Sequence, residues 1–434
     1  MRVLIFEPQF AGHNLAHAAR LAKGVAELGC DVVLSTSRQA AESAEFATHF
    51  GDAPPPDLHI SDGFTLHHRR GQLRTGGPIG ALHTYRALTT AIRETRPQHV
   101  YVPCGNSLSR TAVLPLGLGA ALRGCGAQAE TLMISGRYLQ ANPSPWRRLR
   151  RRLVLNAIAG GPWSRVFHHD DVAWEHFQRH GGRMARLGAL MPDPCSPIVE
   201  SSTQTARHAL GLPEEGRALA VIGLIERRKG IEVLLEAFAT GAKRFGAEDR
   251  LFLLGRCEPA VREMLAGPYA HLVRSGRVVA IDRRLSAEEF GLAVRAADVV
   301  STVYPWHAYT SSILVAAASA GKPVLASDYG WIGRTTRRFR LGQVCNGRSP
   351  ASVAAAAASA LASADQYRPI TAAQRLVRYS TDANYVAHWT ARLRERLGLG
   401  PSPDRVSWEW VTRRQGMPKA TVDRRVLPVA SATA

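Results

Sequence analysis

Long hydrophobic runs are absent from this sequence. No apolar segment reaches the roughly 18 uncharged residues that a membrane-spanning helix needs, so we expect none. The first ten residues, MRVLIFEPQF, also lack the basic region, long apolar core and small-residue cleavage site of a signal peptide. We therefore expect a cytoplasmic protein, which leaves open a peripheral attachment to the inner face of the membrane.

Cysteine is scarce and dispersed. None of the six cysteines stands in a CxxC pair or a His/Cys cluster, so the sequence predicts no zinc site and no other metal site. In a cytoplasmic protein such thiols are expected to be reduced and buried. The six are Cys30, Cys104, Cys125, Cys195, Cys257 and Cys345.

Acidic residues are in deficit, since 35 Asp and Glu stand against 55 Lys and Arg and the formal net charge is +20. A positive field attracts phosphorylated small molecules, acidic membrane surfaces or nucleic acid. The sequence contains neither a recognition-helix motif nor an RNA-binding motif. Nucleic acid is therefore not an expected partner.

The 434 residues are 45% hydrophobic, which suits two or three domains that each bury a core. An apolar run over Val3–Phe6, a loop, a helical stretch ending at Gly29 and a second apolar run over Asp31–Thr36 predict a strand–helix–strand unit. Such a unit begins a parallel sheet. The loop lacks the GxGxxG pattern, so a dinucleotide site is not predicted.

The same alternation recurs on both sides of a proline-rich segment, Met191–Pro197, which we interpret as an interdomain linker. The predicted fold is α/β, with two Rossmann-like parallel-sheet domains facing across a cleft, where open sheets bind ligands. The predicted divisions are a first domain over 1–190, the linker over 191–198, a second domain over 199–375, a helix over 376–400 and a basic, partly disordered tail over 401–434.

The strongest motif is Val221–Ile231, with the sequence VIGLIERRKGI. Its predicted strand ends at Gly223, and the basic run 227–229 precedes a predicted helix. Backbone N–H groups at a helix N-terminus, joined by Arg side chains and a Lys charge, favour a diphosphate. The alternative is a basic turn on the protein surface.

This motif and the segments after it resemble, in order and spacing, the C-terminal domain of GT-B glycosyltransferases, in particular glycosyltransferase family 4. Segments near the N-terminus and the linker resemble that family's N-terminal domain, and the likeness covers most of residues 1–400. The segments are Gly12–Asn14, Gly29–Val32, Val166–Asp171, Val221–Phe238, Leu251–Gly255, Val278–Asp282, Ala297–Asp298 and Ala318–Val324.

The resemblance implies an enzyme that moves a sugar from a nucleoside diphosphate sugar, used as co-substrate without another cofactor. The acceptor is not specified, and lipid-linked compounds and polysaccharides are both options. The first domain would be the acceptor side, the second would bind the nucleotide sugar, and the helix over 376–400 would return to the first domain. A non-catalytic GT-B protein that binds a sugar nucleotide or a protein partner is the alternative function.

The resemblance also assigns roles to residues of this sequence. Lys229, with Arg227 or Arg228, would hold the diphosphate, and cations there would stabilise the charge that develops on the leaving nucleotide. The predicted donor-binding residues are Gly223, Arg227, Arg228, Lys229, Asp282, Ser311, Ser312, Gly321 and Asp328; the predicted acceptor-side residues are Gly12 and Asn14.

Two departures from the family stand at the predicted donor site. Counting back from Gly321, the two positions that usually carry glutamates are Ala308 and Ala316, and the usual arginine after Gly223 is Leu224. A further departure is that no His stands in the segment 135–138. Ribose recognition must therefore use another group or be lost.

A polar loop, Tyr304–Ser312, follows a predicted strand where the carboxylates are missing. We predict that His307 donates to a phosphate or a sugar hydroxyl, and that Ser311 and Ser312 bind an anion at the helix start. The alternative is a helix cap with a structural histidine. His13 is a second catalytic candidate, because it follows the first strand and could accept a proton from the acceptor; a structural role is as compatible with its position.

A segment from Trp146 to Leu155 places five arginines beside an apolar run. Basic amphipathic helices bind anionic headgroups, so an anionic membrane surface is one predicted partner. Alternatively the apolar side faces the core and the arginines are solvated. The five are Arg147, Arg148, Arg150, Arg151 and Arg152.

Overall fold

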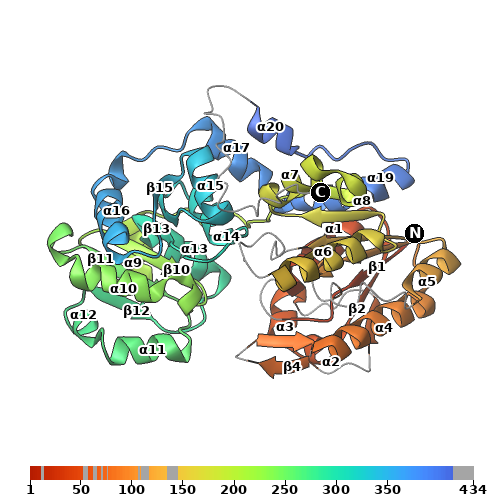
Figure 1. The fold of residues 1–434 in the computed structure, drawn as a ribbon, viewed down its shortest axis with the longest axis horizontal. Helices are drawn as coiled ribbons and strands as arrows, with labels where there is room; N and C mark the ends of the chain where they lie inside the picture. Colours follow the sequence, from red (N-terminus) through yellow and green to blue (C-terminus); the bar gives the residue numbers. More distant parts are fainter. Residues whose placement is uncertain are drawn as a thin grey trace. The chain divides into compact units, whose positions relative to one another are not determined.

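The computed structural model describes residues 1–10, 14–51, 57–61, 66–69, 72–75, 77–105, 108, 117–133 and 145–413. The chain divides into two compact units (Figure 1). Residues 1–191 and 382–405 form the first unit, and residues 192–381 with those from 406 onward form the second. Each unit has its own parallel sheet and its own hydrophobic core.

The first unit is built on a seven-stranded parallel sheet with the order β3-β2-β1-β6-β7-β8-β9. Strand β1, at which the strand order reverses, is an apolar run from Val3 to Phe6, as expected where helices cover both faces of a parallel sheet. Leu4 at its middle pairs with Val33 on one side and Val100 on the other. The strands are β1 (Arg2–Phe6), β2 (Asp31–Ser37), β3 (Asp57–Ser61), β6 (His99–Val102), β7 (Gln128–Met133), β8 (Arg165–His168) and β9 (Gly188–Leu190), with a separate antiparallel pair, β4 (Leu66–Arg69) and β5 (Gln72–Thr75).

Two helices from far along the chain complete the core of the first unit. The Trp389 ring lies 4.7 Å from that of Phe167 and 5.3 Å from that of Tyr101, whose hydroxyl donates to the Trp389 carbonyl. The segment 382–405 is thus an integral part of this core. The helices are α1 (Asn14–Ala26), α2 (Arg38–Ala41), α3 (Ala44–Phe50), α4 (Gly77–Thr95), α5 (Leu118–Cys125), α6 (Pro145–Gly160), α7 (Asp171–His180), α8 (Gly182–Leu187), α18 (Asp382–Trp389) and α19 (Ala391–Arg396).

The second unit has a six-stranded parallel sheet with the order β12-β11-β10-β13-β14-β15. All five residues of its central strand, β10, are buried. The strands are β10 (Ala218–Ile222), β11 (Arg250–Leu254), β12 (Val278–Ile281), β13 (Val299–Thr302), β14 (Val324–Ser327) and β15 (Gly342–Cys345).

Ten α-helices and three short 3-10 turns of the described chain belong to this unit. One of them, α20, lies beyond residue 400, and its Trp408 packs 5.1 Å from Tyr379. The helices are α9 (Thr203–Ala209), α10 (Ile231–Thr240), α11 (Pro259–Ala266), α12 (Ala270–Arg274), α13 (Ala287–Ala296), α14 (Ser312–Ser319), α15 (Gly330–Phe339), α16 (Pro350–Ala362), α17 (Thr371–Tyr379) and α20 (Trp408–Thr412); the turns are Arg227–Lys229, Ala242–Arg244 and Ala364–Gln366.

Both sheets reverse direction at a central strand. In the first unit the chain moves outward from β1 to β3 and then returns to place β6 on the other side of β1; in the second, β13 returns to the other side of β10. Ligands of open α/β sheets bind beyond the carboxyl ends of the strands at such a switch point. The ends of β1 and β6, and of β10 and β13, are therefore the places to look for function.

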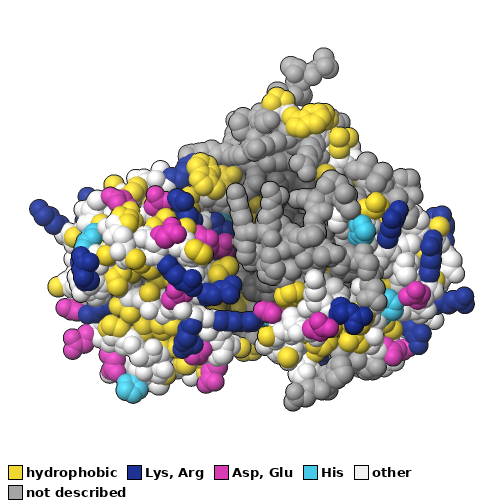
Figure 2. All heavy atoms as spheres, turned by 90° about the horizontal axis from the view of Figure 1, so that it is seen from below, with side chains coloured by type: hydrophobic (Ala, Val, Ile, Leu, Met, Phe, Trp, Pro, Cys, Tyr) yellow, Lys and Arg dark blue, Asp and Glu magenta, His cyan; other side chains and the backbone are white. Residues whose placement is uncertain are grey.

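The α/β architecture with two parallel sheets, predicted from the sequence, is confirmed. In the part of the chain that the structure describes, no helix combines the length and apolarity needed to cross a bilayer, and no three metal-ligating side chains form a cluster. On the face shown in Figure 2, the described Lys and Arg side chains lie among Asp and Glu side chains. The net positive charge is thus dispersed over the described part of that face.

Candidate functional site

Two loops meet at the switch point of the second sheet, one after β10 and one after β13. Gly230 adopts φ +70°, and a Cβ atom there would lie 2.2 Å from the Val303 carbonyl oxygen. From the other side, a Cβ at Gly330 would lie 2.8 Å from the carbonyl oxygen of His307. Both close approaches require glycine. The first holds the two loops against each other, and the second holds the loop after β13 against the start of α15.

Lys229 is the buried cation of this site. Its side chain is 5% exposed, and its Nζ donates to the carbonyl oxygen of Ile222 at 2.6 Å. A Cβ at Gly223 would lie 3.4 Å from the same Nζ, so the amine lies beside the carboxyl end of β10. Burial lowers the pKa of Lys229 to about 7. An anionic ligand would favour its charged form.

The two arginines of the same turn are half exposed and paired with carboxylates. Arg227 contacts Glu232 at 2.8 Å, and Arg228 contacts Glu226 at 2.6 Å. Among the ion pairs found in the described chain, none involves Lys229. The basic turn therefore offers one buried cation without a carboxylate partner, flanked by two cations that are already neutralised.

His307 lies in the loop after β13, half-buried between the rings of Tyr304 and Tyr309. Burial lowers its pKa to about 4, so the ring is neutral at pH 7. Its Nε2 is 3.0 Å from the Thr310 carbonyl oxygen, which can only accept, so Nε2 carries the proton. The remaining nitrogen, Nδ1, is an acceptor. An acceptor nitrogen suits a sugar hydroxyl. The sequence predicted instead that His307 donates a hydrogen bond to a phosphate or a sugar hydroxyl.

The start of α14 faces the same place. Ser311 is at the N-cap and is 6% exposed, but its side chain makes no capping bond. Its hydroxyl lies by the buried phenol of Tyr304, whose pKa burial raises to about 12. The Cδ1 atom of Ile313 is 3.9 Å from the Cβ position of Gly223. The first turn of α14, with Ser312 half-buried in it, thus adjoins the end of β10.

Comparison with known proteins begins with sequence. No family model matches the chain. It is 30% identical over 210 residues to a D-inositol 3-phosphate glycosyltransferase of Corynebacterium kroppenstedtii, covering 47% of this chain and 44% of the relative. The enzyme of that name from Thermomonospora curvata is 25% identical over 390 residues, covering 80% and 81%. The chain spans about half the length of the first of these relatives.

Solved structures match nearly the whole chain. Sucrose-phosphate synthase from Thermosynechococcus elongatus superposes with a TM-score of 0.68 at 18% identity, covering 92% of this chain and 99% of that one. The lipopolysaccharide glycosyltransferase WaaG gives 0.58 at 17% identity over 88% and 95%. The Anabaena protein HepE, solved with UDP, gives 0.58 at 16% identity over 92% and 100%.

The chain has the GT-B fold. The resemblance to GT-B glycosyltransferases that the sequence indicated is therefore confirmed, and the low identities agree with a divergent sequence. The switch point with Lys229 lies in the C-terminal sheet of this GT-B fold. Lys229, His307 and Ser311 come together at the carboxyl edge of that sheet.

Of the other predicted donor-binding residues in this GT-B chain, some lie near Lys229 and others do not. Asp328 directly follows β14, next to β13, and so lies at the same edge. Asp282 follows the outermost strand, β12, where it binds Arg262 at 2.6 Å and the Cys257 N–H at 2.7 Å. Gly321 comes after α14 and before β14, at the amino edge. It lies apart from the group around Lys229.

The two alanines at the positions of the family's glutamates are tightly packed. Ala308 is 4% exposed, and Ala316 on α14 is 1% exposed. A Cβ at Gly330 would lie 2.6 Å from the Cα of Ala308. Both alanine side chains are therefore enclosed, and the polar groups of the site come from other positions.

The predictions for the first unit are only partly within the described structure. Gly12 and His13 lie outside the described residues, and Asn14 is the first residue of α1. The five arginines fall within α6, but their side chains lie outside what the structure describes. Asp170 caps α7 by accepting from the Val172 N–H.

Sequence reasoning missed Glu7. This carboxyl directly follows β1, is 1% exposed, and burial raises its pKa to about 8. The signal in the sequence was a single acidic residue immediately after an uninterrupted apolar strand, which resembles the ordinary start of a loop. Only its burial sets it apart.

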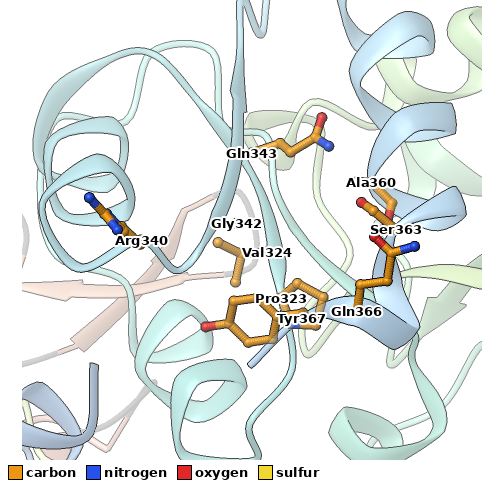
Figure 3. A pocket seen from close by; sticks show the side chains of 9 residues that line it. All are labelled: Pro323, Val324, Arg340, Gly342, Gln343, Ala360, Ser363, Gln366 and Tyr367. Atoms are coloured by element: carbon orange, nitrogen blue, oxygen red, sulfur yellow. The ribbon is translucent and has the colours of Figure 1, made fainter. Parts of the chain in front are cut away.

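A separate pocket of about 290 Å³ opens on the second unit (Figure 3). It is lined by Val324 and Gly342, near the amino ends of β14 and β15, together with Tyr367 and Arg340. These residues lie at the edge of the sheet opposite to Lys229. The pocket is therefore distinct from the switch-point site.

Proposed function

We propose that this protein is a glycosyltransferase that moves a sugar from a nucleoside diphosphate sugar to a hydroxyl group of an acceptor. The observation that carries the proposal is the buried Lys229, which lies beside Gly223 at the switch point of the C-terminal sheet. The names of the relatives support glycosyl transfer, and the UDP bound by HepE supports a uridine nucleotide as the first donor to test.

The reaction breaks the bond between the anomeric carbon and the diphosphate oxygen and forms a bond from that carbon to the acceptor oxygen. The acceptor hydroxyl loses its proton, and the diphosphate leaves with the bonding electrons. A cation at the leaving oxygen stabilises the charge that develops there. Lys229 would supply that cation, because proximity to the diphosphate raises its lowered pKa.

The other polar groups of the site would hold the donor sugar and the ribose. His307 presents an acceptor nitrogen, and Ser312 and Asp328 present polar side chains at the same edge of the sheet. A neutral histidine accepts a hydrogen bond from a hydroxyl without repelling the nearby lysine. We propose that these groups perform the donor recognition that glutamates perform in the resembling family.

The decisive experiment presents UDP-glucose, UDP-N-acetylglucosamine, GDP-mannose and ADP-glucose to the full chain. Released nucleotide is measured with and without inositol 3-phosphate, the acceptor named in the relatives. Turnover of any one donor supports the proposal. Absence of release from all four, together with absence of UDP binding in calorimetry, contradicts it.

A non-catalytic role is the second candidate, since Ala308 and Ala316 are buried and carry no carboxylate. A protein of that kind would bind a nucleotide sugar without consuming it. Saturable binding of UDP-glucose with no nucleotide release over hours would favour this role. The same calorimetry and release measurements therefore separate the two functions.

We also propose that α6 attaches the protein peripherally to an anionic membrane surface at the cytoplasmic face. Trp146, Leu149 and Leu153 are 72%, 46% and 53% exposed, and their spacing places them along one stripe of the helix. The five arginines of α6 are interleaved with them in the sequence. Apolar residues flanked by cations suit the headgroup region of such a membrane.

Vesicles of phosphatidylglycerol and phosphatidylcholine provide the test of this attachment. We expect co-sedimentation at low salt that Trp146→Ser with Leu153→Ser reduces about tenfold. The control is Val273→Ser, an apolar residue of the second unit that is 40% exposed. Equal binding by all three proteins, or no binding even at low salt, contradicts the attachment.

A further inference from the structure

The switch point of the first sheet contains a buried carboxyl group. Glu7 directly follows β1, the strand at which the sheet order reverses, and its side chain is 1% exposed. Its Oε1 accepts from the Gln9 N–H at 3.1 Å. Among the residues that the structure describes, none provides a hydrogen-bond partner for Oε2.

The backbone around Glu7 is fixed by the neighbouring strand. The Glu7 N–H donates to the Ser35 carbonyl at 3.0 Å, and the Thr36 hydroxyl donates to the Glu7 carbonyl at 2.7 Å. The Ser37 hydroxyl donates in turn to the Pro8 carbonyl at 2.8 Å. The end of β2 thus holds the backbone of Glu7 and Pro8 at three points.

Such a group is costly for folding, because a buried polar oxygen without a partner has lost its hydration. Glu130, the comparable buried carboxyl of this sheet, lies instead beside cationic or ionisable groups, 3.7 Å from His99 and 3.6 Å from Arg392. Glu7 has no such neighbour in an ion pair of the described chain. Persistence of an unpartnered polar atom at a ligand-binding position points to a ligand.

We propose that Glu7 binds a hydroxyl group of the sugar acceptor through its free carboxyl oxygen. This inference rests on the proposed glycosyl transfer, which requires an acceptor site in addition to a donor site. The two switch points suit different ligands: the buried amine of Lys229 suits a diphosphate, and the buried carboxyl of Glu7 suits a neutral hydroxyl compound. The expected ligand is therefore a polyol or sugar, contacted at a hydroxyl rather than at any phosphate.

The test uses the full chain and the variants Glu7→Met and Glu7→Gln. Met matches the size of Glu and removes both hydrogen-bonding roles, whereas Gln keeps a polar group at the same place. The probe is inositol 3-phosphate; if it does not stimulate nucleotide release, water is the acceptor and the readout is donor hydrolysis. UDP affinity is measured by calorimetry on each protein.

We expect Glu7→Met to raise the KM for the acceptor, or to slow hydrolysis, about tenfold and to leave UDP affinity within about twofold. Glu7→Gln should lie between wild type and Glu7→Met. The melting temperature of Glu7→Met should change little, since the variant removes the unpartnered Oε2 but also the acceptor of the Gln9 N–H. Glu130→Gln is the control: it should lower the melting temperature without changing the acceptor KM.

Unchanged acceptor kinetics in both Glu7 variants would overturn the inference and leave the proposed function standing. If Glu7→Met does not fold, Glu7→Gln decides alone, and an unchanged KM in it overturns the inference. Wild-type protein that releases nucleotide from no donor overturns the proposed function, and this inference falls with it. The two failures are thus distinguishable.

Discussion

The carboxyl edges of the two sheets can be compared residue by residue. After the central strand of the first sheet comes Glu7, and seven residues beyond the central strand of the second comes Lys229. Both side chains are almost fully buried, and neither has an oppositely charged partner within the described residues. Burial raises the pKa of Glu7 to about 8 and lowers that of Lys229 to about 7.

The difference between these two edges lies in which ligand relieves the burial. A lysine regains its charge beside an anion, so the second edge suits the diphosphate that we propose as its ligand. A protonated carboxyl exchanges hydrogen bonds with a hydroxyl and does not attract phosphate. One topology therefore yields two sites of different selectivity through a single side chain at each switch point.

The largest expected effect concerns the pH dependence of the first unit. Because the folded state keeps Glu7 protonated up to about pH 8 while the unfolded chain releases that proton near the ordinary glutamate pKa of 4.5, stability is lost as pH rises through this window. Between pH 5 and 8 wild type should lose about 4 kcal/mol relative to Glu7→Gln. Urea unfolding at several pH values measures this, and parallel profiles would contradict it.

Gly230→Ala tests whether the second edge depends on close backbone packing. The new methyl group would approach the Val303 carbonyl at 2.2 Å in a left-handed conformation. We expect a loss of about 3 kcal/mol in the free energy of unfolding of the second unit. The control is Gly276→Ala, which has φ +71° and open space around its Cβ position, and should lose only about 1–2 kcal/mol. Equal losses would show that the contact with Val303 contributes nothing.

The sequence predicts those features of the two edges that appear as local patterns, and misses those that depend on the fold. The strands were predictable because parallel strands buried on both faces are continuous apolar runs, as in β1 and β10. Lys229 was found because it belongs to a basic run beside a helix start. Glu7 was missed because burial of a single carboxyl depends on strands and loops that meet only in the fold.

The remaining differences between the sequence-based predictions and the structure come from contacts that only the fold creates. Asp282 is a predicted donor-binding residue, but in the fold its carboxylate accepts a hydrogen bond from Arg262, 20 residues earlier in the chain. The protonated nitrogen of His307 is set by the Thr310 carbonyl, which depends on the path of the loop. Sequence patterns identify the polar positions; hydrogen-bond direction follows only from coordinates.

Lys229→Met should remove the cation and keep the packing. We expect UDP affinity to fall about 30-fold, equivalent to about 2 kcal/mol, as for the loss of a charged hydrogen bond. The folded amine has the lowered pKa, so wild type gains stability as pH rises from 7 toward 10.5, and this gain should vanish in the variant. The control is Lys322→Met; the half-buried Lys322 donates to Thr203 away from this edge. Equal UDP affinity in wild type and Lys229→Met would refute the assignment.

The smallest expected effect belongs to the uncharged part of the second edge. His307→Ala removes an acceptor nitrogen, and Ser312→Ala a hydroxyl, so each should weaken UDP-glucose binding about fivefold. Because His307 is proposed to contact the sugar, its variant should bind UDP itself nearly as well as wild type, in contrast to Lys229→Met. His271→Ala, an exposed histidine of α12, should match wild type for both ligands. If His307→Ala weakens UDP and UDP-glucose equally, the histidine acts on the nucleotide, and the division of the edge into a cationic and a sugar-binding part is wrong.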